Sequence, residues 1–151
     1  MILVTLTDKN NRNDVDIEIS HVAPSASQFI QLRESIGWNN LDSLDEIEQS
    51  IQSSLFWITI VRGKELVACG RVIGDGYMYF YLQDIIVHPK CQGLGFGQMV
   101  MNGIEQWLLT KAKKGATIGL LAAKGKEDFY ARFEYLKRDG SALGLGMCKF
   151  I

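Results

Sequence analysis

Residues 54–89 constrain the fold more than any other stretch, because they read as three consecutive β-strands. The segment SLFWITIVRGKELVACGRVIGDGYMYFYLQDIIVHP is rich in β-branched and aromatic residues, and the turn signals RGK and GDG interrupt it twice. Strands joined by such short turns pair antiparallel, each with the next. The third strand, from about Tyr77 to Val87, is apolar on both faces, which indicates a central position in the sheet.

The segments after these strands are expected to add a parallel neighbour. A helix is expected at 96–108, and ATIGLLAA, at 116–123, reads as a buried strand. Strand–helix–strand order produces a crossover to a parallel strand. The sequence therefore predicts a mixed sheet with helices on both sides, then a short helix at KEDFYARF (126–133) and a closing strand at GMCKFI (146–151).

The N-terminal third carries one more strand and two helices. DVDIEIS, at 14–20, alternates apolar and acidic residues, as a half-buried strand does. Two capping boxes, Ser25 with Gln28 and Ser43 with Glu46, mark the beginnings of two helices. Residues 1–13 are expected to form an extra strand and loop. No linker or repeat divides the chain, so we expect a single domain over residues 1–151.

Charge and cysteine content limit the classes of partner. Sixteen basic and seventeen acidic residues give a net charge of −1, so neither nucleic acid nor an anionic membrane is expected as a partner. No apolar run approaches the roughly 18 residues of a membrane helix. The cysteines and the two histidines show no metal-binding or disulfide spacing. We therefore expect no metal, free thiols and a reducing, cytoplasmic location.

The segment HPKCQGLGFGQMV, at 88–100, places Gly93, Gly95 and Gly97 around the start of a helix. Glycine costs about 1 kcal/mol in a helix interior, so the main chain itself is expected to be needed here. Helix N-terminal N–H groups without nearby Cβ atoms can hold a phosphate closely. Gln98 follows where a P-loop needs lysine and where a dinucleotide motif needs glycine. On these residues alone, a phosphate cradle and a helix start packed closely on the sheet are both open.

The string QGLGFG, at 92–97, resembles the Q/R-x-x-G-x-G/A motif of the GNAT superfamily of acyl-CoA-dependent N-acyltransferases. DIIVHP (84–89) resembles the strand and turn before that motif, EDFYARFEYLKR (127–138) resembles the short helix and strand after it, and GLGMCKFI (144–151) resembles the ending of many bacterial members. The likeness covers nearly the whole chain from Asp14. It implies an α/β (α+β) fold with a mixed, mostly antiparallel sheet, helices on both faces and a splay between the fourth and fifth core strands.

The resemblance also implies acetyl-CoA, or coenzyme A, as the cofactor. The loop is expected to bind the pyrophosphate through its main-chain N–H groups, which are those of Gln92, Gly93, Leu94, Gly95, Phe96, Gly97 and Gln98. The pantetheine arm is expected to lie in the splay beside Ile85, Ile86 and Val87. An open strand edge offers hydrogen bonds to an amide-bearing chain, which agrees with this placement.

Acyl transfer to an amine needs a donor for the developing oxyanion and a proton for the leaving thiolate. The N–H of Ile86 is expected as the oxyanion donor. Tyr130 matches the tyrosine that lies near the coenzyme sulfur in the family, and phenol and thiol pKa values of about 10 and 8.5 suit proton transfer. A buried aromatic residue with a satisfied hydroxyl is the alternative for Tyr130. Cys91 is not expected to act as a nucleophile, and Glu134, where the family commonly has glycine, would be mildly strained in a left-handed conformation.

Asp84 lies in the most apolar strand, and burying a lone carboxylate is costly, so it must have a partner. YLQDIIV resembles the L-E-D strand of diamine acetyltransferases, where acidic side chains face the amine, although Gln83 stands here in place of glutamate. Asp84 is expected at the amine, directly or through a water, and an ion pair with Arg71 is the alternative. The residues expected at the acceptor are Trp38, Tyr81, Gln83 and Asp84.

Together these features predict an N-acetyltransferase that transfers acetyl from acetyl-CoA to a primary amine of a small molecule or peptide. Direct attack in a ternary complex is expected, because no credible nucleophile is present. The alternatives are a non-catalytic acyl-CoA-binding or interaction module with the same fold, and a nucleotide-binding module. A homodimer could form if the apolar last strand pairs across a two-fold axis.

Overall fold

The computed structural model describes residues 2–7, 14–39 and 42–151. The chain divides into two compact units, residues 1–118 and residues 119–151. The first unit contains the long strands and helices, and the second contains one short helix within an otherwise irregular segment. The loop predicted before residue 14 lies outside the described residues, whereas the extra N-terminal strand is present.

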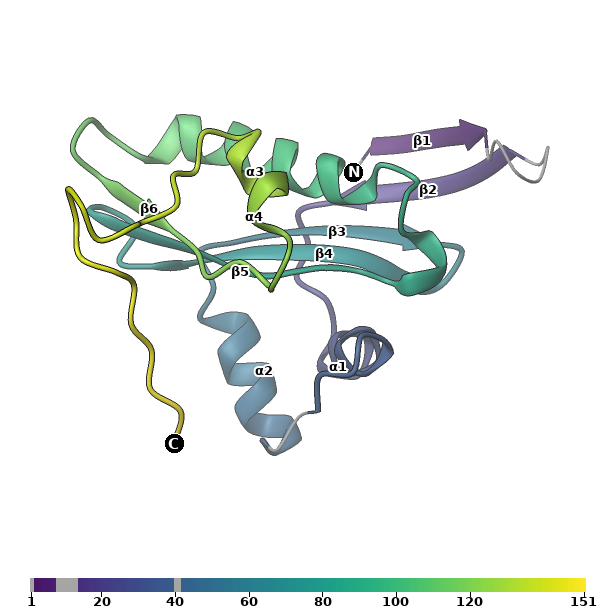
Figure 1. Ribbon diagram of the computed structural model, residues 1–151. Helices are drawn as coiled ribbons and strands as arrows, with labels where there is room; N and C mark the ends of the chain where they lie inside the picture. The colour runs from purple at the N-terminus through teal and green to yellow at the C-terminus, as the bar shows by residue number, and fades with distance from the viewer. Residues whose placement is uncertain (1, 8–13, 40–41) are drawn as a thin grey trace. The chain divides into compact units, whose positions relative to one another are not determined.

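The first unit is built on a sheet whose strands follow one another in chain order (Figure 1). The strands are β1 (Ile2–Thr7), β2 (Asp14–Ser20), β3 (Phe56–Arg62), β4 (Glu65–Gly74), β5 (Tyr79–Val87) and β6 (Thr117–Gly119). From β1 to β5, each strand pairs antiparallel with the next. The three-strand run read from the sequence is thus confirmed, with its tight turns between β3, β4 and β5.

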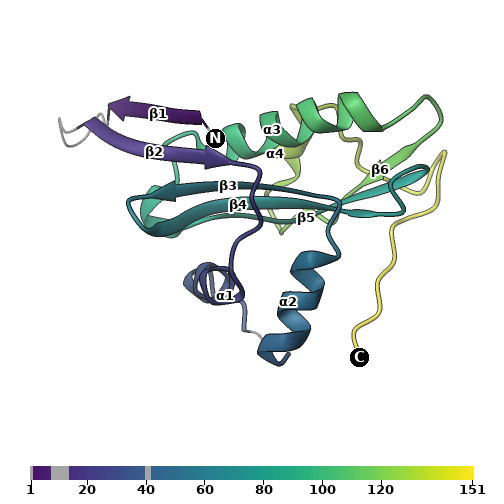
Figure 2. The ribbon, with the colours of Figure 1, turned by 180° about the vertical axis from the view of Figure 1, so that it is seen from behind.

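Helices cover both faces of the sheet, as the sequence predicts (Figure 1 and Figure 2). The helices α1 (Ala26–Ser35) and α2 (Leu44–Gln52) lie on one face, and α3 (Phe96–Lys111) lies on the other. A short 3₁₀ helix, η1 (Pro89–Cys91), connects the end of β5 to the glycine segment before α3. The helix α3 carries the chain from β5 to β6, which produces the parallel element of a mixed, mostly antiparallel sheet.

The strand β6 is much shorter than its neighbour β5. The amide of Thr117 donates to the carbonyl oxygen of Met78 at 2.8 Å, which joins β6 to the residue just before β5. Three residues can accompany only the beginning of a nine-residue strand, so the last residues of β5 extend beyond β6. This is the splay predicted between the fourth and fifth core strands, counted from β2.

Both predicted capping boxes are present. The Ser25 hydroxyl accepts from the Gln28 amide and the Gln28 side chain accepts from the Ser25 amide, and Ser43 and Glu46 repeat this arrangement. Each box satisfies N–H groups that the first helical turn would otherwise leave without a partner. The helix α1 ends before Gly37, whose φ of 81° lies in the left-handed region that glycine commonly adopts after a helix.

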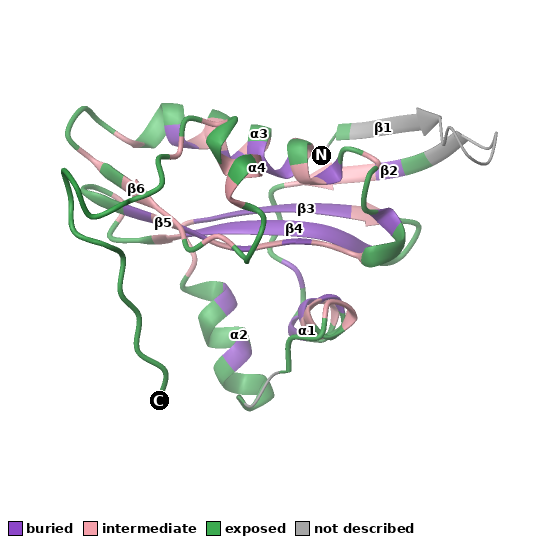
Figure 3. Ribbon diagram, viewed as in Figure 1, coloured by how far each residue is buried: buried purple, intermediate pink, exposed green. Residues whose placement is uncertain are grey.

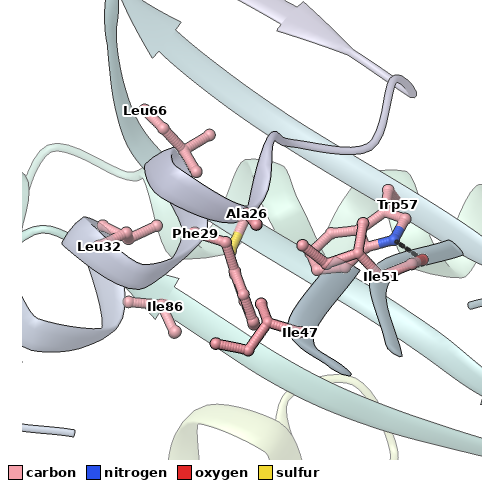
Figure 4. Close-up of a cluster of buried hydrophobic side chains, with 9 residues drawn as sticks. Ala26, Phe29, Leu32, Ile47, Ile51, Trp57, Leu66 and Ile86 are labelled. Atoms are coloured by element: carbon pink, nitrogen blue, oxygen red, sulfur yellow. Dashed lines mark hydrogen bonds between the residues drawn. The ribbon is translucent and has the colours of Figure 1, made fainter. Parts of the chain in front are cut away.

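The core of the first unit lies between the sheet and its helices. The strands β3 and β4 are buried along most of their length (Figure 3). Side chains from α1 and α2 pack on those of the three central strands (Figure 4); the cluster consists of Ala26, Phe29, Leu32, Ile47, Ile51, Trp57, Leu66, Cys69 and Ile86. The Trp57 indole N–H donates to the carbonyl oxygen of Ile51 at 3.0 Å, which satisfies the one polar atom of this buried ring.

The second unit differs from the sequence prediction after its helix. The helix α4 (Glu127–Ala131) is present, but the expected closing strand at 146–151 is not: residues 132–151 form neither helix nor strand. The strand expected at 116–123 is likewise reduced to β6. A strand is stable only beside another strand, and Gly144 and Gly146 have low strand propensity. The apolar residues of this segment are therefore exposed; they include Leu143, Leu145, Met147 and Phe150.

Candidate active site

The glycine segment adopts the conformation that its composition favours. Gly93 and Gly95 have φ values of 80° and 87°, in the left-handed region, and α3 begins directly afterwards at Phe96. A Cβ atom at either glycine would meet nothing within 4 Å. Glycine is therefore required here by backbone conformation and not by close packing on the sheet.

The main-chain N–H groups of residues 93–98 make no hydrogen bond to any other described residue. The first main-chain bond at this end of α3 runs from the Met99 amide to the Gly95 oxygen at 3.1 Å. Free N–H groups at a helix N-terminus, together with the positive end of the helix dipole, favour an anion. Gln92 differs from the other predicted donors, since its amide already donates to the Pro89 oxygen at 3.3 Å.

Hydrogen bonds fix the loop to the end of β5. The Gln92 side-chain amide donates to the carbonyl oxygen of Val87 at 3.2 Å. The His88 ring accepts the Lys90 amide at its Nδ1 atom, and the His88 oxygen accepts the Cys91 amide at 2.8 Å. Local hydrogen bonds thus determine the path of the chain from β5 to α3 without any ligand.

A β-bulge interrupts β5 immediately before its last residues. Residues 69–71 of β4 lie opposite residues 83–86 of β5, so β5 holds one extra residue. Asp84 lies at this point with φ 53°, a left-handed conformation that is uncommon outside glycine but more accessible to aspartate. A bulge changes which face the following side chains occupy.

The side chains around the bulge divide between the two faces of the sheet. Asp84 and Ile86 lie on the face covered by α1, because Asp84 bonds to Arg33 of α1 and Ile86 belongs to the core cluster there. Ile85 lies against α3 on the opposite face. An added Cβ at Gly70 would come within 2.7 Å of the Ile85 side chain, so Gly70 leaves the space that this side chain occupies.

The main-chain directions of residues 85–87 follow from the ladder between β4 and β5. The His88 amide donates to the Val67 oxygen of β4 at 2.8 Å. Because these directions alternate along an antiparallel strand, the N–H and C=O of Ile86 also point toward β4, and those of Ile85 and Val87 point away from it. The Val87 oxygen accepts the bond from the loop, as this direction requires. The outward positions on β5 thus belong to Ile85 and Val87, while the amide of Ile86, the predicted oxyanion donor, is turned toward β4.

Two arginines hold the Asp84 carboxylate. Arg71 Nε lies 2.7 Å from Oδ2, and Arg33 Nη1 lies 2.6 Å from Oδ1. The Asp84 side chain is completely buried. Arg71 Nη1 also donates to the main-chain oxygen and hydroxyl of Ser50 and to the Ser54 hydroxyl. The ion pair with Arg71 that the sequence left open is therefore present.

Arg33 is a residue that the sequence interpretation missed. It lies one turn after Phe29 on α1, and its guanidinium stacks over the Phe29 and Trp38 rings at 5.4 and 5.3 Å. The sequence could have indicated its role, because Arg33 lies beside Phe29 and Leu32 on the apolar face of α1, which turns toward the sheet. A cation on that face needs an anionic partner, and Asp84 supplies it.

The predicted acceptor residues share one face of the sheet. Gln83 pairs with Arg71 across β4 and β5, and directly opposed residues point to the same face. Tyr81 lies two residues earlier and is placed on that face by the strand period. Both are half-buried, and Trp38 is 37% exposed beside Arg33.

Tyr130 lies in α4 of the second unit. Its ring contacts Phe129 and Tyr135 edge to face, with centroid distances of 5.1 and 6.5 Å. Burial raises the pKa of Tyr130 above the usual range of a phenol. The following Glu134 has φ 67°, the left-handed conformation considered for it from the sequence.

The three thiols differ in access to solvent. Cys69 and Cys91 are buried, and Cys148 is exposed. Burial raises the pKa of the Cys69 thiol, which lies 3.5 Å from the Asp84 main-chain oxygen.

Within the described residues, histidine, cysteine and acidic side chains form no group of three that could hold a metal ion. None of the described helices combines the length and apolar character needed to cross a membrane.

Comparisons with known proteins give one consistent family. The family model described as Acetyltransferase (GNAT) domain matches residues 52–136, a range that begins in the first unit and ends in the second. The uncharacterized N-acetyltransferase ycf52 of Pyropia yezoensis is 27% identical over 119 residues, which are 76% of this chain and 67% of that relative. Serotonin N-acetyltransferase 2, chloroplastic, of Oryza sativa subsp. japonica is 38% identical over 64 residues, 42% of this chain and 31% of that protein.

A solved structure shows the same fold. The crystal structure of a probable acetyltransferase from meticillin-resistant Staphylococcus aureus has a TM-score of 0.79 at 22% identity, and the match covers 88% of this chain and 99% of that one. The family model covers more than half of the sequence and includes the glycine segment, the bulged strand and α4. The chain belongs to the GNAT family of acetyltransferases and is an acyltransferase.

Proposed function

We propose that the protein transfers an acetyl group from acetyl-CoA to a primary amine of a small molecule or peptide, by direct attack in a ternary complex. The observation that carries the proposal is the row of free N–H groups at residues 93–98, at the N-terminus of α3. A row of this kind suits the pyrophosphate of coenzyme A, because main-chain donors and the helix dipole both favour negative charge. Gly93 and Gly95, both in the left-handed region, place no side chain beside those donors.

The outward edge of β5 suits the pantetheine arm. The N–H and C=O groups of Ile85 and Val87 point away from β4 and lie beyond the short strand β6. An amide-bearing chain can hydrogen-bond to such an edge as an added strand. The Ile86 side chain supports the edge from the core, since it is almost completely buried.

When bound, acetyl-CoA supplies the acetyl group as an activated thioester. We assign stabilisation of the negative charge on its carbonyl oxygen to the outward N–H of Ile85, in place of the N–H of Ile86. The amine would form the new C–N bond as the C–S bond breaks, and its nitrogen would give up one proton to water. Tyr130 gives its phenolic proton to the departing sulfur and regains one from solvent. Its raised pKa keeps the hydroxyl protonated at neutral pH, as a proton donor requires.

The acceptor side is proposed at the residues that share the α1 face of the sheet, which are Trp38, Tyr81, Gln83 and Asp84. Aromatic rings and a half-buried amide suit a small amine that carries apolar groups. Asp84 is bonded to two guanidinium groups, so an amine at this face would meet a cluster with a net charge of +1. An uncharged amine is therefore the form that this face favours.

Purified protein should release coenzyme A from acetyl-CoA in the presence of a panel of primary amines. Coenzyme A and ATP should be titrated side by side, because a nucleotide-binding module would prefer ATP. Tight binding of coenzyme A without turnover on any amine would favour a non-catalytic acyl-CoA-binding module. Preference for ATP, or no affinity for either ligand, would overturn the proposal.

We also propose a reducing compartment, with the cytoplasm as the first choice, on the basis of the free thiols. The name of the rice relative gives it a chloroplast location, which makes a plastid the competing choice. Localisation of a tagged chain by microscopy distinguishes the two. A homodimer through the apolar residues 143–151 is a further proposal, which sedimentation of the purified protein tests.

A further inference from the structure

Asp84 has an unusual main-chain conformation that neither core packing nor the proposed chemistry requires by itself. Asp84 is a non-glycine residue in a left-handed conformation, and it is completely buried. Such a conformation persists only where the surroundings determine it. The surroundings here are two guanidinium groups that bind opposite oxygens of one carboxylate.

The two arginines connect separate elements to the bulge. Arg33 comes from α1, and Arg71 comes from the middle of β4. Arg71 also binds the Ser50 main-chain oxygen in α2, so one carboxylate joins β5 to β4 and to both helices of that face. Arg33 stacks on Phe29 and Trp38, which restricts the direction from which it reaches Asp84.

The residue after Asp84 is held from the opposite face. The Ile85 side chain fills the space above Gly70, together with Val100 and Ile104 of α3. The Asp84 carboxylate is thus held on the α1 face while the Ile85 side chain is held on the α3 face. The peptide between them has little freedom to rotate, and it carries the Ile85 N–H that points outward.

We infer that Arg33 and Arg71 are positioning residues: through the Asp84 carboxylate they hold the β5 bulge in the conformation that turns the main chain of Ile85 and Val87 outward. The inference rests on the proposed function in one respect: the outward edge of β5 is taken to bind the pantetheine arm of coenzyme A. It gives Asp84 a role different from that of a base, because both of its oxygens already accept from cations. The amine proton then leaves by another route, such as water.

Arg33→Gln tests the inference, because Arg33 is partly exposed on α1 and its loss leaves the Arg71–Asp84 pair in place. Amide hydrogen exchange is measured on the ligand-free protein, and coenzyme A affinity by calorimetry. We expect faster exchange at Ile86 and His88, whose amides are turned toward β4, weaker coenzyme A binding, and a kcat lowered by up to about 100-fold, the scale for a misplaced reacting group. Arg33→Lys keeps the positive charge, so its exchange rates, coenzyme A affinity and kcat should lie close to those of wild type. Arg62→Gln, at an exposed arginine of β3, is the matched control.

The double variant Arg33→Gln/Asp84→Asn separates positioning from catalysis. If the residues act as one unit, the double variant is no worse than Asp84→Asn alone. A base at Asp84 predicts instead that Asp84→Asn lowers kcat with coenzyme A affinity and exchange unchanged, while Arg33→Gln has little effect. That pattern would overturn the inference, as would Arg33→Gln protein that melts earlier but keeps its exchange rates and coenzyme A affinity. If wild-type protein binds no coenzyme A, the proposed function fails, and the exchange rates still decide whether the arginines hold the bulge.

Discussion

The Gln92 side-chain amide donates to the main-chain oxygen of Val87 at 3.2 Å, so one hydrogen bond joins the outward edge of β5 to the loop before α3. In the proposed complex these two surfaces contact different parts of coenzyme A, the pantetheine arm and the pyrophosphate. The bond therefore sets the distance between two binding surfaces before the ligand arrives. Preorganisation of this kind increases affinity because less order is lost on binding.

Replacing Gln92 by alanine should weaken coenzyme A binding. A typical hydrogen bond contributes about 1 kcal/mol, so a loss of roughly three- to tenfold in affinity is expected. Calorimetric titration measures it. Gln106→Ala, at an exposed position of α3, is the control and should bind normally. Equal affinities of the two variants would contradict the role given to the Gln92–Val87 bond.

The left-handed conformation of Gly95 can be tested by the size of the replacement side chain. Gly95→Ala should lower the free energy of unfolding by roughly 1–2 kcal/mol, because alanine is strained in this left-handed conformation. It should also lower coenzyme A affinity, because it adds a methyl group within the segment of free N–H groups. Asparagine adopts the left-handed conformation more readily than alanine does, but its side chain is larger. If access of the phosphate dominates, asparagine binds more weakly than alanine, although it destabilises the fold less. Calorimetry and thermal melting together measure both quantities, and wild-type affinity in both variants would count against the cradle.

Gly70 should resist enlargement more than an exposed glycine does. A Cβ there would lie 2.6 Å from Val100 Cγ1 and 2.7 Å from the Ile85 side chain. Overpacking of this kind costs about 1–3 kcal/mol, so Gly70→Ala should lower the free energy of unfolding by that amount in a urea titration. Gly144→Ala meets nothing within 4 Å and should leave it unchanged. A Gly70→Ala protein as stable as wild type would show that the contact with Ile85 relaxes freely.

Tyr130→Phe should lower kcat by about 10²-fold or more, the scale of a lost general acid, with KM for acetyl-CoA little changed. Burial raises the pKa of Tyr130, so the phenol stays protonated through neutral pH. It loses its proton, and with it the ability to act as the acid, only well above neutral pH. In the folded state the protonated phenol is favoured, so its contribution to stability is complete below the pKa of the unfolded chain and disappears as the pH rises through the folded value. Tyr79→Phe, at an exposed tyrosine, is the control. A Tyr130→Phe enzyme of normal kcat would remove the residue from the mechanism.

The capping box of α2 predicts a pH dependence of stability. The Ser43 hydroxyl, and then the Ser43 amide, lower the pKa of Glu46 by donating to its carboxylate. A lowered pKa stabilises the fold above the pKa of the unfolded chain, and that contribution disappears as the pH falls through the folded value. Ser43→Ala should lower the free energy of unfolding by about 1 kcal/mol, as expected for a lost N-cap.

Urea titrations at pH 7 and at pH 3 to 5 separate the two parts of this effect. The difference between wild type and Ser43→Ala should shrink toward the acid end, because Glu46 becomes protonated in both proteins. Ser27→Ala, at an exposed helical position, should show no such pH dependence. A difference that is constant across this range would mean that Glu46 takes no part in the cap.

The elements that the sequence predicted correctly are those determined by local chemistry. The caps at Ser25 and Ser43, the turns between β3, β4 and β5, and the glycine start of α3 each depend on a few neighbouring residues. The turns and the strand–helix–strand order also predicted the antiparallel run and the parallel crossover, and the family resemblance added the splay. All of these appear in the structure with boundaries shifted by only a few residues.

The features that the sequence did not predict depend on residues far apart in the chain. The pairing of Arg33 with Asp84 joins positions 51 apart, and no short pattern records it. The bulge changes the direction of each main-chain group after Gln83, so the outward amide falls on Ile85 and not on Ile86. The closing strand failed for a related reason: residues 146–151 are apolar enough for a strand, but a strand also needs a neighbour.

The burial of two thiols and the exposure of the third allow the two units to be followed separately. Cys69 and Cys91 lie in the first unit, and Cys148 lies in the second. A maleimide dye added to native protein should attach at Cys148 alone and give a fluorescent reporter confined to the second unit. The rate at which the other two sulfurs are labelled would then report openings of the first unit, and so measure its local stability without any denaturant.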